Sequence, residues 1–102
     1  MKYEIEIIEE AENDVFEIIK WYNEQQENLG FEFYEVLLMM YDEICVQPLH
    51  FKFIFKQFRK TTTLHFPYNI FFRIDGDKII VVGVFHQKRK PSLWRKRLKT
   101  KS

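Results

Sequence analysis

The stretch VVGVFHQKRKPSLWRKR, residues 81–97, passes from purely apolar to strongly basic at a single histidine. The apolar run begins at Ile79 and continues to Phe85, and a run of this length predicts a strand near the centre of a sheet, covered on much of both faces. Six of the eleven residues that follow His86 are lysine or arginine, a density that a buried segment does not tolerate. We therefore expect the chain to leave the core at His86 and to form a cationic surface.

Two further β segments precede this strand. Residues 66–74, FPYNIFFRI, are joined to it by Asp75-Gly76-Asp77, and glycine in such a link favours a tight hairpin turn because it accepts a positive φ. Residues 51–55, FKFIF, are similarly rich in residues that favour strands. The second half of the chain is thus predicted to form an antiparallel meander of three strands.

The first half of the chain predicts one strand followed by two helices. Residues 2–8, KYEIEII, alternate between charged and apolar side chains, as a half-buried strand does. Apolar residues at helical spacing then predict a helix from Glu10 and a second helix from about Phe31 to Val46. Gly30 is expected to end the first helix in a left-handed conformation, and so short a link folds the two helices into an antiparallel hairpin.

The predicted order is β-α-α-β-β-β, an α+β fold in which an antiparallel sheet packs against the helical hairpin. The chain of 102 residues is expected to be a single domain, residues 1–102, because each half alone would be too small to bury a core. Trp21 is expected to pack inward from the first helix, the alternative being exposure at an interface. The solvent side of the same helix is expected to hold Glu12, Asp14, Glu17 and Lys20.

The net charge of +1 conceals a strong segregation of charge along the sequence. Residues 1–45 contain thirteen acidic residues and two lysines, a net charge of −11, whereas residues 46–102 contain fourteen basic and two acidic residues, a net charge of +12. A basic half of this density attracts a polyanion or an acidic protein. The alternative is that the two halves neutralise each other within the fold.

The composition indicates which cellular compartment and which bound groups are expected for the chain. Cys45 is the only cysteine, so no internal disulfide forms and a reducing compartment, the cytoplasm, is expected. The longest apolar runs are too short to span a bilayer, and no membrane partner is expected. Because His50, His65 and His86 are widely spaced and glycine is scarce, neither a metal site nor a cofactor is expected.

Several motifs, in order along the chain, resemble the RelE/ParE family of bacterial toxins, and the resemblance spans nearly the whole chain. The most specific is a His-x-x-Arg-x-Pro-x-x-Trp pattern that begins at His86 and ends at Trp94. The resemblance implies the toxin of a type II toxin–antitoxin pair, whose partner is a cognate antitoxin. The other motifs are Trp21-Tyr22, residues 29–33 (LGFEF), Phe58-Arg59-Lys60 and Phe66-Pro67-Tyr68.

The family resemblance implies two possible activities. RelE-like members cleave messenger RNA within the ribosome, whereas ParE-like members inhibit DNA gyrase without a known catalytic chemistry. The long helical hairpin is more typical of the ParE-like branch, so the leading hypothesis is a non-enzymatic, ParE-like toxin that binds gyrase. A metal-independent endoribonuclease is the alternative, and a third hypothesis is a non-toxic module that only pairs with its antitoxin.

RNA cleavage needs a group that moves protons and cations that stabilise the charge developing at phosphorus. His86 is the acid–base candidate because histidine titrates near neutral pH, although a half-buried, hydrogen-bonded histidine would give the same pattern. Nuclease-type relatives, as the resemblance implies, have an arginine and a tyrosine where this chain has Asn69 and Gln87, and neither amide replaces the missing group. The predicted catalytic set, for a nuclease only, is His86, Arg89, Arg73 and Arg59.

A binding function requires only a shaped and charged surface. A short helix is expected after Pro91, with its arginines turned outward and Trp94 capping the sheet, although Trp94 could instead stack on a base. The antitoxin is expected to present a helix or strand to apolar patches of the helical hairpin or to an open sheet edge. The predicted target-binding residues are Lys88, Arg89, Lys90, Trp94, Arg95 and Arg97.

Overall fold

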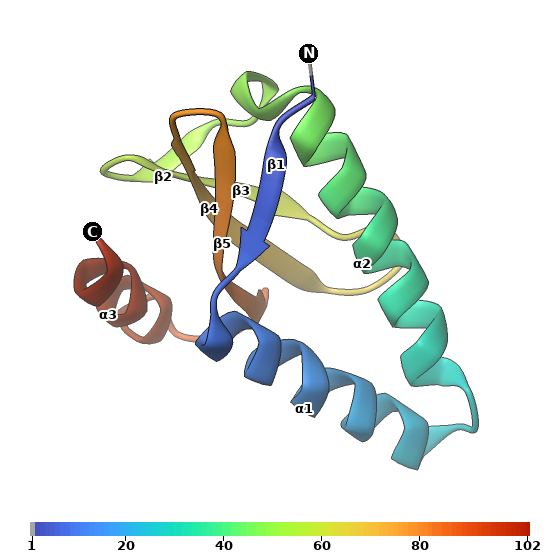
Figure 1. The fold of residues 1–102 in the computed structure, drawn as a ribbon. Coiled ribbons are helices and arrows are strands. Elements are labelled where there is room, and N and C mark those ends of the chain that lie inside the picture. Colours follow the sequence, from blue (N-terminus) through green and yellow to red (C-terminus); the bar gives the residue numbers. More distant parts are fainter. Residues whose placement is uncertain (1) are drawn as a thin grey trace.

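The computed structural model describes residues 2–102 and shows an α+β fold (Figure 1). The helical hairpin lies against one face of the sheet and the C-terminal helix against the other, which confirms the predicted class and the predicted hairpin. Within these residues no helix has both the length and the apolar composition needed to cross a membrane. The elements are β1 (Glu4–Ile7), α1 (Glu9–Gln25), α2 (Leu29–Val46), the 3-10 helix η1 (Pro48–His50), β2 (Phe53–Phe55), β3 (Phe58–Thr62), β4 (Tyr68–Asp75), β5 (Lys78–His86) and α3 (Pro91–Lys101).

The strands of residues 2–102 form one sheet in the order β1-β5-β4-β3-β2. The neighbours from β2 to β5 are antiparallel, as predicted, but β1 runs parallel to β5. The sheet is therefore mixed, which differs from the wholly antiparallel sheet that the sequence predicts. The parallel pair arises because α1 and α2 carry the chain from one edge of the sheet to the other, and the meander then returns to β1 in the same direction.

The strand β3 is an addition to the predicted meander. Only Phe58 of its five residues is fully buried, and the following Arg59-Lys60-Thr61 gives no alternating apolar pattern. Pairing with β4 along the whole of Phe58–Thr62 orders this segment. Its strand conformation thus depends on the neighbouring strand more than on its own residues.

The strand β5 is buried throughout residues 79–85, as its apolar run predicts. Its neighbours in the sheet are β1 and β4, so β5 is the second strand from one edge, and β4 is the middle strand of the five in the described residues. One face of β5 belongs to the core beneath α1 and α2, and the other face belongs to the core beneath α3. Cover on both faces and hydrogen bonding on both edges explain why a continuous apolar run is stable here.

A β-bulge near the centre of β5 changes which side chains face which layer. Val82 has no direct partner on β4, because the residues that pair with β4 on either side of it are Val81 and Gly83. The usual alternation is thereby reversed, so that Val84 faces the helical hairpin and Phe85 faces α3. The bulge lies beside the functional site described below.

The turn between α1 and α2 differs from its prediction at Gly30. The left-handed residue is Asn28, with φ of 69°, and Gly30 lies within the first turn of α2. A Cβ at Gly30 would lie 2.2 Å from the carbonyl oxygen of Ile19. Gly30 is therefore needed for the close approach of the two helices, and its N–H donates a hydrogen bond to Asn23 Oδ1 (2.7 Å).

The helix α3 confirms the prediction of a short helix after Pro91. Leu98 is fully buried, and the ring of Trp94 stacks on Phe71 with the centroids 5.2 Å apart. Trp94 thus caps the sheet, as expected. Arg97 contradicts the expectation that the arginines face outward, because its side chain turns toward α1.

Candidate functional site

The chain turns sharply where β5 leaves the core. His86 is half-buried, and its ring packs edge-on against Tyr68 with the centroids 5.1 Å apart. Its Nδ1 accepts a hydrogen bond from the Lys88 N–H (3.0 Å), and the Gln87 N–H donates to the Pro67 carbonyl (2.8 Å). One ring nitrogen of His86 is therefore engaged in holding the turn.

Tyr68 lies beside this turn and is a neutral hydrogen-bond donor at physiological pH. Its burial and the neighbouring Tyr22 phenol raise the pKa of Tyr68 to about 12. The rings of Tyr22 and Tyr68 lie edge to face, with the centroids 6.1 Å apart. A protonated phenol can donate a hydrogen bond, but it does not act as a base at neutral pH.

Five exposed cations begin at the turn and continue onto α3, and we refer to them as the cationic surface. In the part of the chain that the structure describes, none of the five forms an ion pair with a carboxylate. Arg89 lies over the ring of Phe85 (5.5 Å) and Arg95 over the ring of Trp94 (5.2 Å), so aromatic faces support two of the charges. The cationic surface consists of Lys88, Arg89, Lys90, Arg95 and Lys96.

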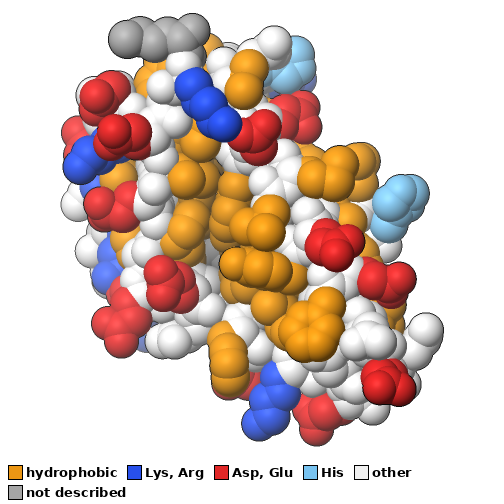
Figure 2. Space-filling model, turned by 45° about the vertical axis from the view of Figure 1, so that its right-hand side comes forward, with side chains coloured by type: hydrophobic (Ala, Val, Ile, Leu, Met, Phe, Trp, Pro, Cys, Tyr) orange, Lys and Arg blue, Asp and Glu red, His pale blue; other side chains and the backbone are white. Residues whose placement is uncertain are grey.

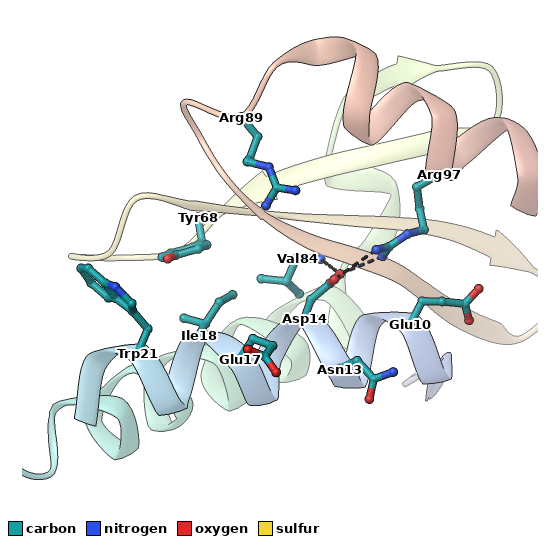
Figure 3. Close-up of a pocket in the computed structure, with 10 residues that line it drawn as sticks. All are labelled: Glu10, Asn13, Asp14, Glu17, Ile18, Trp21, Tyr68, Val84, Arg89 and Arg97. Carbon is teal, nitrogen blue, oxygen red and sulfur yellow. Dashed lines mark hydrogen bonds and ion pairs between the residues drawn. The ribbon is translucent and has the colours of Figure 1, made fainter. Parts of the chain in front are cut away.

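A groove of about 490 Å³ separates this surface from α1 (Figure 3). Arg89 points into the groove from the loop after β5, and Glu17 lies on the α1 side. Trp21 is 54% exposed at one end, so the expectation that it packs inward is wrong and the alternative of exposure holds. Tryptophan and arginine are the side chains that contribute most to protein–protein interfaces. The groove is lined by Glu10, Asn13, Asp14, Glu17, Ile18, Trp21, Tyr68, Val84, Arg89 and Arg97.

The floor of the groove contains a bidentate ion pair between α1 and α3. Arg97 donates to both carboxylate oxygens of Asp14, at 2.8 and 3.1 Å, and also to the Val82 carbonyl (3.1 Å). Asp14 in turn accepts a hydrogen bond from the Val84 N–H (3.1 Å). The two side chains are only 15% and 22% exposed for Asp14 and Arg97 respectively.

The ion pair continues the hydrogen bonding of β5 beyond the end of β1. The last bond from the β1 side runs from the Ile8 N–H to the Val81 carbonyl. Past this point β1 has turned into α1, and the bulge in β5 presents the Val82 carbonyl and the Val84 N–H to the side chains of Arg97 and Asp14. The pair therefore satisfies backbone groups that would otherwise lack a partner.

Asp14 and Arg97 are the residues whose roles the sequence analysis misses. Asp14 is predicted to face solvent and Arg97 to bind a target, whereas each is directed at the other. A signal for Asp14 exists, because it lies three residues after Ala11 and four before Ile18, both buried on the inner face of α1. Arg97 has a comparable signal, because it lies three residues after Trp94, which packs on Phe71, and directly before the buried Leu98.

The four residues of the nuclease hypothesis do not form one cluster. Arg59 faces the hairpin side, where it donates to the Phe51 carbonyl (2.6 Å). Arg73 faces the α3 side, 3.5 Å from Asp75. Arg73 is five residues along β4 from Tyr68, the partner of His86, and five residues of strand span roughly 17 Å. The structure thus brings together His86 and Arg89, and it does not bring Arg59 or Arg73 to them.

The acidic and basic halves of the sequence remain largely unpaired in the fold. Among residues 2–102 only two ion pairs join them, Asp14 with Arg97 and Glu10 with Lys101. The other two pairs, Lys2 with Asp42 and Arg73 with Asp75, each lie within one half. Mutual neutralisation therefore does not account for the charge segregation, and twelve of the fourteen basic residues after residue 45 have no acidic partner from the first half of the described chain.

Comparison with known proteins assigns the family. The model of the family described as ParE toxin of the type II toxin–antitoxin system parDE matches residues 5–91. The chain belongs to this family of toxins. The matched region runs from the second residue of β1 to the first residue of α3, so the family assignment rests on nearly the whole sheet and on the helical hairpin.

Two solved structures share the fold of this ParE-family toxin. A chain of the chromosomal ParDE toxin–antitoxin system from P. aeruginosa superimposes with a TM-score of 0.75 at 12% identity, covering 83% of this chain and 96% of that one. An E. coli RelE toxin mutant in the free state gives a TM-score of 0.56 at 11% identity, covering 98% of each chain. No curated protein sequence matches the chain. The predicted toxin family and fold are confirmed.

Proposed function

We propose that this ParE-family toxin arrests growth by binding DNA gyrase through the cationic surface. The observation that carries the proposal is that all five cations of this surface are exposed and lack a carboxylate partner in the described chain. Unpaired charges in water attract an acidic partner and speed its association. Of the predicted target-binding residues, Lys88, Arg89, Lys90 and Arg95 belong to this surface. Trp94 lies under Arg95, and Arg97 lies at the floor of the adjacent groove.

The groove beside the cationic surface extends the proposed contact. Trp21 and Arg89 border a hollow large enough for a few side chains of a partner protein, and Glu17 on the α1 side would repel a phosphate backbone. A folded protein surface therefore suits this groove better than a nucleic acid. We place the toxin in the cytoplasm, where gyrase acts, in keeping with its buried, unpaired Cys45.

A ribosome-dependent endoribonuclease is the alternative, in which His86 and Arg89 would act together. Two observations weigh against it: the engagement of His86 Nδ1 in the turn, and the separation of Arg59 and Arg73 from His86 in the sheet. Among residues 2–102 no group of three or more potential metal ligands occurs.

The cognate antitoxin is the second partner, and we propose that it covers the outer groove between α1 and α2. This hairpin groove, of about 410 Å³, lies on the side of α1 opposite Trp21 and is lined by Phe16, Tyr34 and Tyr41 among others. Phe16, Leu38 and Met39 are exposed on the two helices. Exposed apolar side chains in such number mark an interaction surface.

The gyrase proposal is tested with the purified toxin in a DNA supercoiling assay with purified E. coli gyrase, supported by mapping of RNA 5′ ends after induction without antitoxin. Loss of supercoiling at near-stoichiometric toxin, with messages intact, is the expected result. New RNA ends inside translated codons, with gyrase unaffected, would replace the proposal by the nuclease alternative. Growth that continues on induction would instead identify a non-toxic module.

A further inference from the structure

A second hollow adjoins the groove beside the cationic surface. It has a volume of about 320 Å³ and lies between α3 and the start of α1. Glu10, Arg89 and Arg97 line both hollows, so the two meet at these side chains. We refer to the two hollows together as the track, which runs along α1 from Trp21 to Glu10 and continues onto α3 (Figure 3).

Each of the two hollows has an exposed apolar side chain. Trp21 is 54% exposed at the end of the first hollow, and Leu93 of α3, which lines the second, is 44% exposed. From Trp21 to Glu10 the helix α1 is about 17 Å long, the length of roughly five residues of extended chain. A short segment of a partner protein is therefore long enough to contact both hollows.

Two of the three carboxylates that line the track are already neutralised. Asp14 pairs with Arg97, and Glu10 pairs with Lys101. The third carboxylate, Glu17, has no ion-pair partner in the described chain. Glu17 lies one helical turn before Trp21, so the remaining negative charge is confined to one end of the track.

The cations that remain free lie farther along the track. Arg89 lines both hollows and Lys96 lines the second, and neither forms an ion pair within residues 2–102. The guanidinium of Arg89 lies 5.5 Å from the centre of the Phe85 ring, which supports it from the sheet side. Two free cations in a hollowed surface attract carboxylates of a partner.

The hairpin side of the molecule has the opposite charge. Figure 2, which brings the α2 side forward, shows aspartate and glutamate on both sides of a stripe of hydrophobic side chains. Lys20 is the only basic residue in residues 9–46, which contain α1 and α2. An acidic segment is therefore repelled by the hairpin and attracted to the track.

We infer that the track receives a short acidic segment of gyrase, whose carboxylates pair with Arg89 and Lys96 and whose apolar side chains pack on Trp21 and Leu93. The inference rests on the proposed function and adds the chemistry of the gyrase segment. A nucleic acid suits the track less well, because Glu17 repels a phosphate at the Trp21 end.

The apolar contact is tested with Trp21→Ala and a matched control, Phe31→Ala, which removes a ring of similar exposure (56%) that lines neither hollow. Binding to immobilised E. coli gyrase without DNA is measured by biolayer interferometry, after circular dichroism has shown that both variants are folded. Trp21→Ala is expected to bind about tenfold more weakly and Phe31→Ala like the wild type. Wild-type affinity of Trp21→Ala would overturn the inference.

The charge of the segment is tested on α3 with Lys96→Glu and a control on the same helix, Lys99→Glu, which is exposed and lines neither hollow. Lys96→Glu is expected to weaken binding about tenfold at low salt and Lys99→Glu much less. Equal losses would overturn the track. Glu17→Gln should bind as tightly as the wild type or more tightly, and weaker binding would overturn the acidic character of the segment.

Photocrosslinking identifies the occupant of the track. With p-benzoylphenylalanine in place of Leu93, the crosslinked gyrase peptide is expected to contain more acidic than basic residues, and a basic peptide would overturn the inference. A crosslink to another toxin chain would assign the track to the acidic hairpin of a second copy and overturn the gyrase segment. Binding to gyrase that requires DNA, together with equal affinity for duplex DNA alone, would overturn it in favour of nucleic acid.

The outcomes separate this inference from the function on which it rests. Binding that Lys96→Glu weakens and Trp21→Ala leaves unchanged would overturn the track and leave the gyrase contact of the cationic surface intact. A wild-type toxin that does not bind gyrase would overturn the proposed function and this inference together.

Discussion

Asp14 and Arg97 are 83 residues apart in the sequence and meet where β1 ends beside β5. The pair contributes more to the stability of the fold than a surface ion pair does, because both side chains are largely buried and both also form hydrogen bonds with the β5 backbone. Removal of either partner leaves a charge and a backbone group without a counterpart. At the scale of single residues this pair is the strongest polar link between the two layers of helices.

Asp14→Asn is expected to lower the free energy of unfolding by about 2 kcal/mol, since Arg97 keeps its charge but loses its carboxylate in a partly exposed site. Urea denaturation followed by circular dichroism measures the change. Lys2→Met, which breaks the exposed pair with Asp42, is the control and should leave the midpoint unchanged. Equal effects of the two substitutions would contradict the structural role of Asp14.

Glu10 gives a second residue-scale prediction, which depends on pH. A hydrogen bond from Lys101 is the main reason that the pKa of Glu10 is lowered from its ordinary value of 4.5. Because the pKa of Glu10 is lower in the folded state than in the unfolded state, its contact with Lys101 stabilises the fold at pH values above the ordinary carboxyl pKa. This stabilisation is lost as the pH falls through the lowered pKa of the folded state. We expect the stability difference between wild type and Glu10→Gln, measured by thermal unfolding, to be present at pH 7 and to vanish near pH 3. A constant difference across this range would contradict the link.

At the scale of elements, the α1–α2 hairpin depends on one point of close contact. The carbonyl of Ile19 occupies the space that a side chain at Gly30 would need. The turn itself depends on Asn28, which takes the left-handed conformation that asparagine tolerates better than most residues. The two helices therefore meet closely near the turn that joins them, and their separation sets the shape of the surface proposed for the antitoxin.

Gly30→Ala is expected to destabilise the fold by about 3 kcal/mol, because backbone must move to admit the methyl group. Gly76→Ala is the matched control: φ there is +62°, but nothing lies within 4 Å of the added Cβ. Its cost should be about 1 kcal/mol from backbone strain alone. Denaturant titration compares the two, and a smaller loss for Gly30→Ala than for Gly76→Ala would rule out close packing as the reason for Gly30.

At the scale of the whole molecule, the fold separates charge into two surfaces with different proposed partners. The acidic hairpin lies on one side of the sheet, and the cationic surface lies at the end of β5 and on α3. Because only two ion pairs join the two halves of the described sequence, each surface keeps its field. Two surfaces of opposite charge allow the molecule to bind partners of opposite charge at different places.

Arg89→Glu is expected to weaken gyrase inhibition at least tenfold, with a larger effect at low salt because exposed charges are screened at high salt. Lys20→Glu makes the same charge change on the hairpin and serves as the control, with inhibition expected to remain near wild type. His86→Gln should keep most of the inhibition if the fold is intact by circular dichroism. Equal loss of inhibition from His86→Gln and Arg89→Glu would contradict a contact that depends on the charges of the cationic surface.

The sequence by itself determined the elements whose conformation follows from a local pattern of side chains. The alternation in β1, the helical periodicity of α1 and α2, the apolar run of β5 and the proline at the start of α3 each specify a conformation through their own side chains. The charge segregation and the family motifs are likewise properties of the sequence, and they sufficed for the fold class and for the ParE-family assignment.

Only the tertiary structure decided which distant residues meet. It paired β3 with β4, made β1 parallel to β5, exposed Trp21 and turned Asp14 and Arg97 toward each other. These features depend on hydrogen bonds and packing between segments far apart in the chain, and no local pattern encodes them. The bulge in β5 is an example. One extra residue reverses the alternation of the strand, and the Val82 carbonyl and Val84 N–H beside it form hydrogen bonds with Arg97 and Asp14, which come from two different helices.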